Sequence, residues 1–365
     1  MATAVEEIGA FRDALLAWYE GNRRDLPWRH TRDPYAILVS EILLQQTRTA
    51  AAESYYRRFM DRFPTPHALA EAGPEEVLHA WEGLGYYGRA RRLHAAAKEI
   101  VKVHGGLVPR RPDVLRTLPG VGPYTAGAVA SIAYEQKAPA VDGNVTRVLA
   151  RVYRIEEDVG LSSTKRLIRA RATRLVPDRV PGTFNQAFME LGALVCLPRK
   201  PRCKACPIRP WCQARAARVE TTLPRRGKVS AVPTLAAVFA LLERHDKVLL
   251  VRRGEDELLG GLWALPGGEL AGTESPGRGL RRLLRERHGV RARPGPEIGR
   301  HVHTFSHKRW DAVAIRCELE EDPILSAHQR WIRREELGDL PLVPFHRAFL
   351  EEHGSPSLEA FTVER

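Results

Sequence analysis

The chain has 365 residues, of which 44% are hydrophobic and 28% are charged, and its formal net charge is +13. This length favours about two folded domains. No apolar stretch approaches the length that spans a bilayer, so we exclude a membrane protein. Residues 1–11 carry two glutamates and lack the basic start and apolar run of an export signal. We therefore expect a cytoplasmic protein with no membrane partner.

The positive charge is concentrated in the first part of the chain. Residues 1–233 contain 37 Lys and Arg against 23 Asp and Glu, a net charge of +14, whereas residues 234–365 contain 20 against 21, a net charge of −1. A basic part of this kind fits a surface that binds the phosphates of a polyanion. An arginine-rich composition of the whole proteome is the alternative explanation.

Apolar periodicity divides the chain into a helical part and an α+β part. Residues 9–217 have apolar residues three and four apart between breaks rich in Pro and Gly, and we expect helices and no strands there. Residues 218–233 lose this periodicity and gain Pro and basic residues, as a linker does. Residues 234–365 are expected to form an α+β domain. Its expected strands are 234–243, 247–253, 301–305 and 311–319, and its expected helix is 280–289.

Glu41 is the first candidate for chemistry along the chain. It lies in the segment YAILVSEILLQQT, with apolar residues on both sides. Burial of a carboxylate without a partner is costly, and an enclosed carboxyl group holds its proton more tightly. Such a group can donate a proton at neutral pH. A salt bridge to one of the many arginines is the structural alternative.

A glycine-rich turn follows at residues 118–122, between a helix-like run and a helix of small residues. Gly120 and Gly122 would let the backbone approach a phosphate closely, and the N-terminus of the next helix offers unpaired N–H groups to an anion. Asp142 stands at the entrance of the helix after that one. A plain turn and a plain helix N-cap are the alternatives at these two places.

The cysteines give the most specific spacing in the sequence. Cys196, Cys203, Cys206 and Cys212 follow a predicted helix as C-x6-C-x2-C-x5-C, in a loop that also carries basic residues suited to phosphate contact. Cytosolic chains rarely keep disulfides, so clustered thiols indicate a 4Fe-4S cluster or a zinc ion. The spacing is not the paired pattern of zinc ribbons, which favours the cluster. Cys317 lies in a strand-like run, and we interpret it as an inert core residue.

Taken together, these motifs resemble a known family. The segments LPGVGPYTAGAV and VDGNVTRV, with the cysteine loop, resemble the helix-hairpin-helix DNA glycosylase superfamily with an iron-sulfur cluster over residues 9–217. The segments SEILLQQTRT, WEGLGYYGRARRL, GLWALPGGE and HTFSHKRW extend the resemblance to the adenine DNA glycosylase (MutY) family. The resemblance implies two helical lobes followed by a Nudix-like domain. It also implies a monomeric enzyme that flips and removes adenine mispaired with 8-oxoguanine or guanine in double-stranded DNA.

The resemblance assigns roles to individual residues. It implies that Glu41 protonates adenine, and that Asp142 stabilises the developing sugar cation or attacks it, as in other glycosidases with two carboxylates. Asn144 and Tyr124 would assist by hydrogen bonding around Asp142 and the sugar. The base pocket would be lined by Arg29 and Glu190, and the duplex would be probed and wedged by Gln46, Thr47, Leu84 and Tyr86. For Tyr86, a position in the hydrophobic core is the alternative to a contact with the duplex.

One departure from a related branch is informative. Bifunctional glycosylase/lyases such as endonuclease III have a catalytic lysine second after the LPGVG turn, where this chain has Pro123 and Tyr124. Without an amine at that place, no Schiff base with the sugar forms by that route. We therefore expect a monofunctional glycosylase that leaves an abasic site.

The second part of the chain resembles the Nudix fold, whose hydrolases bind Mg2+ through acids on one helix. Alignment of the Nudix pattern leaves Leu283 and Arg287 where two acids are required. We interpret the domain as a reader without hydrolase activity, and the resemblance implies that Phe305, Ser306 and His307 contact 8-oxoguanine. A surface histidine is the alternative for His307. Nucleotide pyrophosphate hydrolysis and a non-enzymatic DNA-binding or redox protein are the rival hypotheses.

Overall fold

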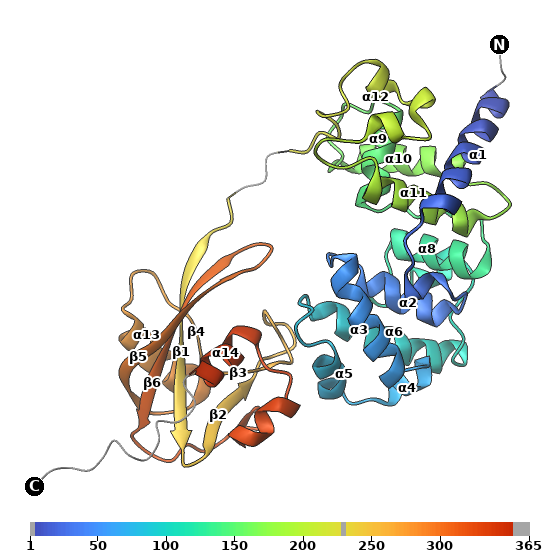
Figure 1. The fold of residues 1–365 in the computed structure, drawn as a ribbon. Coiled ribbons are helices and arrows are strands. Elements are labelled where there is room, and N and C mark those ends of the chain that lie inside the picture. Colours follow the sequence, from blue (N-terminus) through green and yellow to red (C-terminus); the bar gives the residue numbers. More distant parts are fainter. Residues whose placement is uncertain (1–3, 228–230, 353–365) are drawn as a thin grey trace, which may run out of the picture. The chain divides into compact units, whose positions relative to one another are not determined.

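The computed structural model describes residues 4–227 and 231–352, with side chains from residue 7 onward (Figure 1). Contacts divide the chain into two units. The helical unit comprises Met1–Ala72 and Arg92–Val229, and the mixed unit comprises Gly73–Arg91 and Ser230–Arg365. In the two described ranges, no helix is both long and apolar enough to cross a membrane.

The first 227 residues contain helices and no strand wherever the structure describes them, as the periodicity predicts. The helices are α1 (Ala4–Asn22), α2 (Pro34–Leu43), α3 (Thr49–Arg62), α4 (Pro66–Glu71), α5 (Pro74–Ala80), α6 (Gly88–His104), α7 (Pro112–Leu115), α8 (Pro123–Tyr134), α9 (Gly143–Val152), α10 (Ser162–Leu175), α11 (Pro181–Leu194) and α12 (Gln213–Ala216). Short 3-10 turns occur at Pro27–Arg29, Cys203–Ala205 and Arg209–Trp211.

Local sequence signals explain how the central helices begin and pack. Asp33 caps α2, because its side chain accepts a hydrogen bond from the N–H of Tyr35 at 3.1 Å, and Pro34 occupies the first helical position. α8 consists largely of small residues, so α2 and α11 both pack against it. Gly182 in the first turn of α11 is required there, because a Cβ atom would lie 2.5 Å from the carbonyl oxygen of Ser131 on α8.

A single core holds the first and last helices of the helical unit together. Phe11 and Leu15 of α1 pack with Leu149 of α9 and Phe188 of α11, and each is at most 3% exposed. Ile208 of the cysteine loop belongs to the same core. Burial of each of these side chains contributes about 1.5–3 kcal/mol. The packing therefore fixes α9, which begins after Asp142, against both α11 and the cysteine loop.

The mixed unit contains a seven-stranded sheet with helices packed on it (Figure 1). The strands are β1 (Thr234–Arg244), β2 (Lys247–Arg252), β3 (Trp263–Ala264), β4 (Gly267–Glu269), β5 (Ala292–Thr304), β6 (Arg309–Leu319) and β7 (Gln329–Arg333). Their order is β3-β2-β1-β6-β5, with β4 also paired to β1 and β7 to β2. β1 and β6 are parallel, and the other pairs are antiparallel. The helices are α13 (Pro276–His288) and α14 (Pro344–Glu352).

The four expected strands and the expected helix are all present, which confirms the α+β class of this part. Leu280 and Leu284 of α13 are buried against Val238 of β1 and Val313 of β6. Strands β3 and β4 escaped the sequence analysis because they are only 2 and 3 residues long, too short to show an alternating pattern.

Part of the segment that we expected to be a linker packs on the helical unit. Leu223 is 2% exposed, and its carbonyl oxygen accepts a hydrogen bond from Arg151 Nε at 2.9 Å. The N–H of Gly227 donates to the carboxylate of Asp158 at 2.9 Å. Residues 228–230 of the expected linker lie outside the described residues.

Candidate active site

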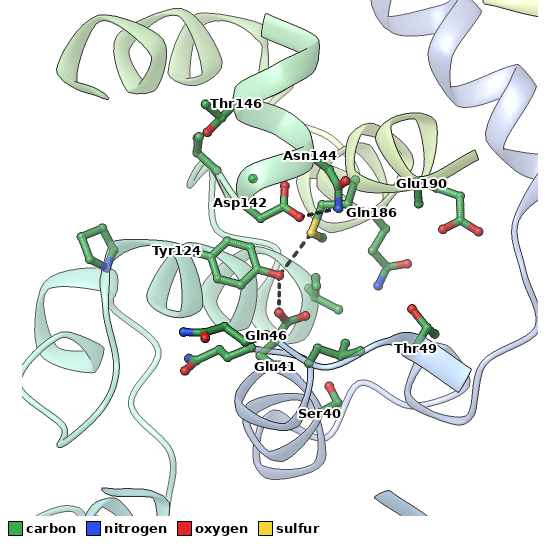
Figure 2. Close-up of a pocket in the computed structure, with 18 of the residues that line it drawn as sticks. Ser40, Glu41, Gln46, Thr49, Tyr124, Asp142, Asn144, Thr146, Gln186 and Glu190 are labelled. Carbon is green, nitrogen blue, oxygen red and sulfur yellow. Dashed lines mark hydrogen bonds between the residues drawn. The ribbon is translucent and has the colours of Figure 1, made fainter. Parts of the chain in front are cut away.

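The helical unit contains a cavity of about 870 Å3 between α2, α8, α9 and α11. Figure 2 shows Glu41 and Asp142 approaching the hydroxyl group of Tyr124 from opposite sides, from helices that are far apart in the sequence. The structure thus brings most of the sequence-predicted site residues of this unit together. The predicted residues that line the cavity are Arg29, Glu41, Gln46, Thr47, Tyr124, Asp142, Asn144 and Glu190.

Glu41 is the buried acid that its apolar surroundings predicted. Every residue of α2 after the first is buried, and Glu41 is 4% exposed. Burial, with a smaller contribution from the charge of Asp142, raises the pKa of its carboxyl group to about 7, although the hydrogen bond from Tyr124 and the charge of Arg29 oppose the rise. Within the described part of the chain, Glu41 is hydrogen bonded to Tyr124 and forms no salt bridge to an arginine, which was the structural alternative. At neutral pH a large fraction of Glu41 therefore carries its proton.

Tyr124 stands in the first turn of α8 and connects the two sides of the cavity. Its hydroxyl group donates a hydrogen bond to Glu41 Oε2 at 2.5 Å, and its oxygen lies 3.3 Å from the sulfur of Met189. Burial raises the pKa of Tyr124 well above its ordinary value, and the neighbouring carboxylates act in the same direction. Tyr124 is therefore a neutral hydroxyl donor at this place.

Asp142 is both the N-cap of α9 and a wall of the cavity, so the two alternatives for this residue are combined. Its Oδ1 accepts a hydrogen bond from the N–H of Val145 at 2.7 Å, and its Oδ2 accepts one from Asn144 Nδ2 at 2.8 Å. Burial raises the pKa of Asp142, although these hydrogen bonds and the charge of Arg147 oppose the rise. The positive end of the helix dipole also favours the carboxylate form.

The side chain of Asn144 is itself held in place by a neighbouring arginine. Its Oδ1 accepts a hydrogen bond from Arg147 Nη2 at 2.8 Å, and the same nitrogen donates to the carbonyl oxygen of Gly192 on α11 at 2.9 Å. A Cβ atom on Gly192 would lie 2.5 Å from the Cβ of Asn144, so α9 and α11 touch at this point. The amide that orients Asp142 is therefore fixed by two helices.

Glu190 is a second acidic residue in the same cavity, and its protonation state is the opposite of that of Glu41. It is 1% exposed, and Arg24 and Arg29 both bind its Oε2, at 2.7 Å and 2.8 Å. Burial alone would raise the pKa of Glu190, but the hydrogen bonds from the two arginines lower it to about 2. Glu190 is thus a fixed anion with two guanidinium groups oriented beside it.

Several lining residues were not predicted from the sequence. Arg24 is one of four arginines in the ten residues 23–32, and no local signal distinguishes it from its neighbours as a partner of Glu190. The other unpredicted lining residues that carry polar or sulfur atoms include Gln45, Thr49, Lys165, Arg166, Arg169, Gln186 and Met189. Lys165, Arg166 and Arg169 lie on α10 and give one side of the cavity a basic border.

Both parts of the chain are similar to known proteins. Residues 39–178 match the model of the HhH-GPD superfamily base excision DNA repair proteins, and residues 237–352 match a NUDIX domain. The chain is 37% identical to the adenine DNA glycosylase of Homo sapiens over 91% of its own length and 72% of that protein. It is 47% identical to the adenine DNA glycosylase of Mycobacterium tuberculosis (strain ATCC 25618 / H37Rv), over 59% of this chain and 71% of that protein.

The chain belongs to the adenine DNA glycosylase family. It is therefore a DNA glycosylase of base excision repair. Among solved structures, a thermostable thymine-DNA glycosylase matches with a TM-score of 0.54 and 32% sequence identity, over 59% of this chain and 100% of that one. Residues 39–178, which match the glycosylase superfamily, include Glu41, Tyr124 and Asp142.

The remaining predicted residues of this adenine DNA glycosylase family member lie outside the cavity. Gly120 is in the turn before α8 with a φ of +78°, and a Cβ atom there would lie 2.8 Å from the Cβ of Arg92. Gly122 is the N-cap of α8. Leu84 and Tyr86 are in the loop after α5, where Tyr86 is 49% exposed with a φ of +51°. Exposure and a left-handed backbone at a non-glycine residue are typical of functional positions.

The four cysteines of the loop all line one small cavity. Cys196, Cys203, Cys206 and Cys212 line a single cavity of about 20 Å3. Arg151, which is 2% exposed, donates a hydrogen bond to Cys196 Sγ at 3.2 Å. Burial raises the pKa of Cys206 to about 12, so thiolates here need a bound cationic group. Four thiols facing one cavity fit an iron-sulfur cluster, although in the described ranges no three such ligands are close enough for a single metal ion.

The predicted reader residues form an exposed turn between β5 and β6. The N–H of Phe305 donates to the carbonyl oxygen of Lys308 at 2.8 Å, which closes the turn. The ring of Phe305 contacts that of Trp310 edge-on, with centroids 5.0 Å apart. Ser306 and His307 are exposed. The turn therefore presents two polar side chains on an aromatic support.

The residues of the Nudix pattern do not fit a magnesium site. Leu283, in place of one acid, belongs to the hydrophobic core of the mixed unit. Glu274 accepts two hydrogen bonds from Arg282, at 3.1 Å and 2.9 Å, and Glu286 Oε2 lies 3.5 Å from the same side chain. The remaining carboxylates are thus bound to an arginine, and the other acid position is occupied by Arg287.

Proposed function

We propose that this glycosylase hydrolyses the N-glycosidic bond of adenine mispaired with 8-oxoguanine or guanine in double-stranded DNA, and leaves an abasic site. One observation carries the proposal. Glu41 and Asp142, from distant parts of the sequence, line one cavity with the Tyr124 hydroxyl group between them, and the pKa of Glu41 is near 7. Two carboxyl groups in different protonation environments are what glycoside hydrolysis requires.

The reaction divides between the two acids. Glu41 transfers its proton to a ring nitrogen of adenine, and the bond between the base and the anomeric carbon then breaks with its electron pair on the base. Asp142 faces the resulting sugar cation as a carboxylate, oriented by Asn144. Water adds to the anomeric carbon and its proton returns to Glu41. No residue changes its oxidation state, and no further reactant is needed.

Tyr124 explains why the reaction stops at the abasic site. A lyase needs an amine that attacks the sugar and forms a Schiff base. Tyr124 offers only a hydroxyl group whose pKa is well above the ordinary value, so it remains protonated and hydrogen bonded to Glu41. The DNA strand therefore stays intact after the base has been removed.

The pocket for the adenine is formed by the group around Glu190. Arg24 and Arg29 are held by Glu190 in fixed positions at the cavity wall, where they can face the flipped base without any rearrangement. Flipping costs a few kcal/mol, which is offset by residues that fill the gap and hold the strand. We assign this role to Gln46, Thr47, Leu84 and Tyr86, of which Gln46 and Tyr86 have left-handed backbone conformations.

The exposed turn at 305–307 is proposed to recognise the oxidised guanine opposite the adenine. Ser306 and His307 supply hydrogen-bonding groups, and Phe305 supplies a ring for stacking. We propose the same boundaries as the sequence suggested: a glycosylase domain at 1–217, a linker at 218–233 and a reader domain at 234–365.

A 4Fe-4S cluster is proposed as the resident cofactor of the cysteine loop. Cys196, Cys203, Cys206 and Cys212 would hold it, and Arg151 would donate a hydrogen bond to one of the ligating sulfurs. When bound, the cluster would crosslink the end of α11 to α12. This crosslink would fix a loop whose basic side chains can contact phosphates.

Excision of thymine from a mispair with guanine is the second candidate, because a thymine-DNA glycosylase is 32% identical to this chain with a TM-score of 0.54. The two candidates are separated by single-turnover assays on duplexes with adenine opposite 8-oxoguanine, adenine opposite guanine, and thymine opposite guanine. We expect excision of adenine from the first two and none of thymine. We also expect strand breaks only after alkali treatment, and breaks without alkali would overturn the role of Tyr124.

Matched variants test the assignments. Glu41→Gln and Asp142→Asn should each lower the excision rate by at least about 100-fold and keep mismatch affinity, since they replace an acid by its amide. Ser306→Ala with His307→Ala should reduce the preference for 8-oxoguanine over guanine and leave excision opposite guanine unchanged. Magnesium-dependent hydrolysis of free oxidised nucleotides, abolished by Glu286→Gln, would instead favour the hydrolase hypothesis.

A further inference from the structure

The mixed unit contains a cavity of about 290 Å3 that the proposed reaction does not use. It lies between the end of β2, the last turn of α13 and the loop before β7. Its charged walls include Arg253, Arg287 and Glu257, and Ser326 and His328 stand at its exposed side. The cavity therefore contains guanidinium groups beside hydroxyl and imidazole groups.

Arg287 puts a positive charge at a position where the Nudix pattern has a negative one. In the Nudix pattern its position carries an acid that binds Mg2+, and here the neighbouring acid, Glu286, lies 3.5 Å from Arg282 Nη1. A cation in place of a metal ligand excludes the metal by repulsion and puts a fixed positive charge at the same position.

Arg253 adds a second positive charge, and it is deeply buried. Its side chain is 8% exposed, and its Nε donates to the carbonyl oxygen of Leu258 at 2.6 Å. Its Nη2 lies 3.6 Å from Glu257 Oε2, while Arg287 Nη2 binds Glu257 Oε1. One carboxylate thus lies between two guanidinium groups, and this group of three side chains carries a net positive charge.

The neighbouring His288 and Gln329 do not neutralise this net positive charge. His288 is half-buried, and the N–H of Gly267 donates to its Nε2 at 3.1 Å. Burial lowers the pKa of His288 to about 4, so His288 is neutral at physiological pH and adds no charge. Gln329 accepts a hydrogen bond from the N–H of Ser326 at 2.9 Å and thereby fixes the exposed side of the cavity. Uncompensated positive charge in a half-buried cavity is unfavourable unless an anion enters.

We propose that this cavity binds a phosphate group directly, without a metal ion, through Arg253 and Arg287. Guanidinium groups bind phosphate oxygens with paired hydrogen bonds, and the cavity has room for more than one phosphate. Nudix hydrolases use Mg2+ to bind pyrophosphate groups, whereas in this domain arginine side chains supply the positive charge. The phosphate belongs either to a free nucleotide or to a DNA strand, and the experiment separates these two sources.

The test is calorimetric titration of the full-length protein with inorganic pyrophosphate, in the presence of a chelator that removes Mg2+. We expect binding that Arg287→Ala weakens at least tenfold and Arg287→Glu, which restores the acid of the pattern, abolishes. Arg281→Ala is the matched control, because Arg281 lies on the same helix and pairs with Glu320 outside the cavity. A circular dichroism spectrum and a thermal unfolding transition that match those of the unchanged protein verify that each variant is folded.

A second titration uses an undamaged DNA duplex. If the phosphate is that of a strand, Arg287→Ala lowers duplex affinity, reduces its salt dependence by about one phosphate contact, and the duplex displaces pyrophosphate. If the phosphate is that of a free nucleotide, pyrophosphate binding alone is lost. Pyrophosphate binding that survives both substitutions of Arg287, or that requires Mg2+, overturns the proposal.

Discussion

Glu41 and Glu190 line the same cavity, but their surroundings move their pKa values in opposite directions. Glu41 accepts a single hydrogen bond from a neutral tyrosine, and burial raises its pKa to about 7. Glu190 is equally buried, but two arginines lower its pKa to about 2. The partners of each carboxyl group, and not its depth, therefore decide which one donates a proton.

The first prediction concerns the pH dependence of excision. Because only protonated Glu41 can donate, the single-turnover rate should fall as the pH rises through about 7. Tyr124→Phe removes a hydrogen bond that lowers the pKa of Glu41, so the falling limb should move to higher pH by up to about 1 unit. Rates measured from about pH 5 to about pH 9 give the falling limb of each protein.

Tyr153→Phe is the control for this prediction, because Tyr153 lies outside the cavity at the end of α9. Its pH profile should match that of the unchanged protein. A limb that stays in place in Tyr124→Phe, or that moves to lower pH, would show that Glu41 does not act as the acid.

The sequence predicted the chemistry of single residues better than their partners. An acid surrounded by apolar residues, such as Glu41, indicates burial through its own neighbours. The pairing of Glu190 with Arg24 is different, because it joins positions 166 residues apart. The packing of α1 against α11 brings Arg24, which follows α1, next to Glu190. A contact between residues so far apart in the chain cannot be predicted from a local sequence pattern.

At the scale of elements, close contact between helices positions the site. Gly182 in α11 touches the backbone of α8, where an added Cβ atom would lie 2.5 Å from Ser131 O and 2.7 Å from Ile132 Cα. Gly182→Ala should therefore destabilise the protein by about 1–3 kcal/mol and lower its Tm by several degrees. Thermal unfolding followed by circular dichroism measures the effect.

Gly9→Ala provides the comparison for that measurement. Gly9 lies inside α1, and an added Cβ atom would meet nothing within 4 Å. The alanine should stabilise the helix by about 0.5–1 kcal/mol through its higher propensity. Equal effects of the two substitutions would contradict the tight α8–α11 packing described above.

The cysteine loop supports a prediction about metal content. The purified protein should contain about four iron atoms per chain and absorb visible light near the wavelength of an iron-sulfur cluster. Cys206→Ser should lower the iron content and weaken DNA binding, whereas Cys317→Ser, at a buried position on β6, should change neither. Stoichiometric zinc in place of iron would contradict the cluster assignment.

The elements of the fold were also predicted to different degrees. Long periodic segments such as α1 and β6 can be predicted from the sequence, since each repeats its apolar pattern over many residues. The parallel pairing of β1 with β6 is set by the order of strands in the sheet, which no single segment encodes. The packed stretch around Leu223 was read as linker because its apolar residue stands alone between basic and proline residues.

At the scale of the whole molecule, the charge is divided unequally, with +14 in residues 1–233 and −1 in residues 234–365. The basic border on α10 belongs to the positive part. Lys165→Ala with Arg166→Ala should weaken duplex binding for all sequences and reduce the slope of log affinity against log salt by about 2. The measurement is a binding titration from about 50 to about 200 mM salt.

The control for the salt dependence is Arg330→Ala in the second part of the chain. Arg330 is exposed on β7 and lies over the Trp263 ring at 5.2 Å. Its removal changes the net charge by one without changing the basic border, so the slope should stay the same. An equal loss of slope in both variants would mean that the overall charge, and not the border on α10, governs binding.

The burial of Glu41 has a consequence for the timing of catalysis. Because the pKa of Glu41 is about 7, a large fraction of the molecules already carry this proton at neutral pH when the substrate arrives. Solvent therefore does not have to deliver an acid after the nucleic acid has covered the entrance. At constant pH and ionic strength, the excision step should run at the same speed in dilute and concentrated buffer.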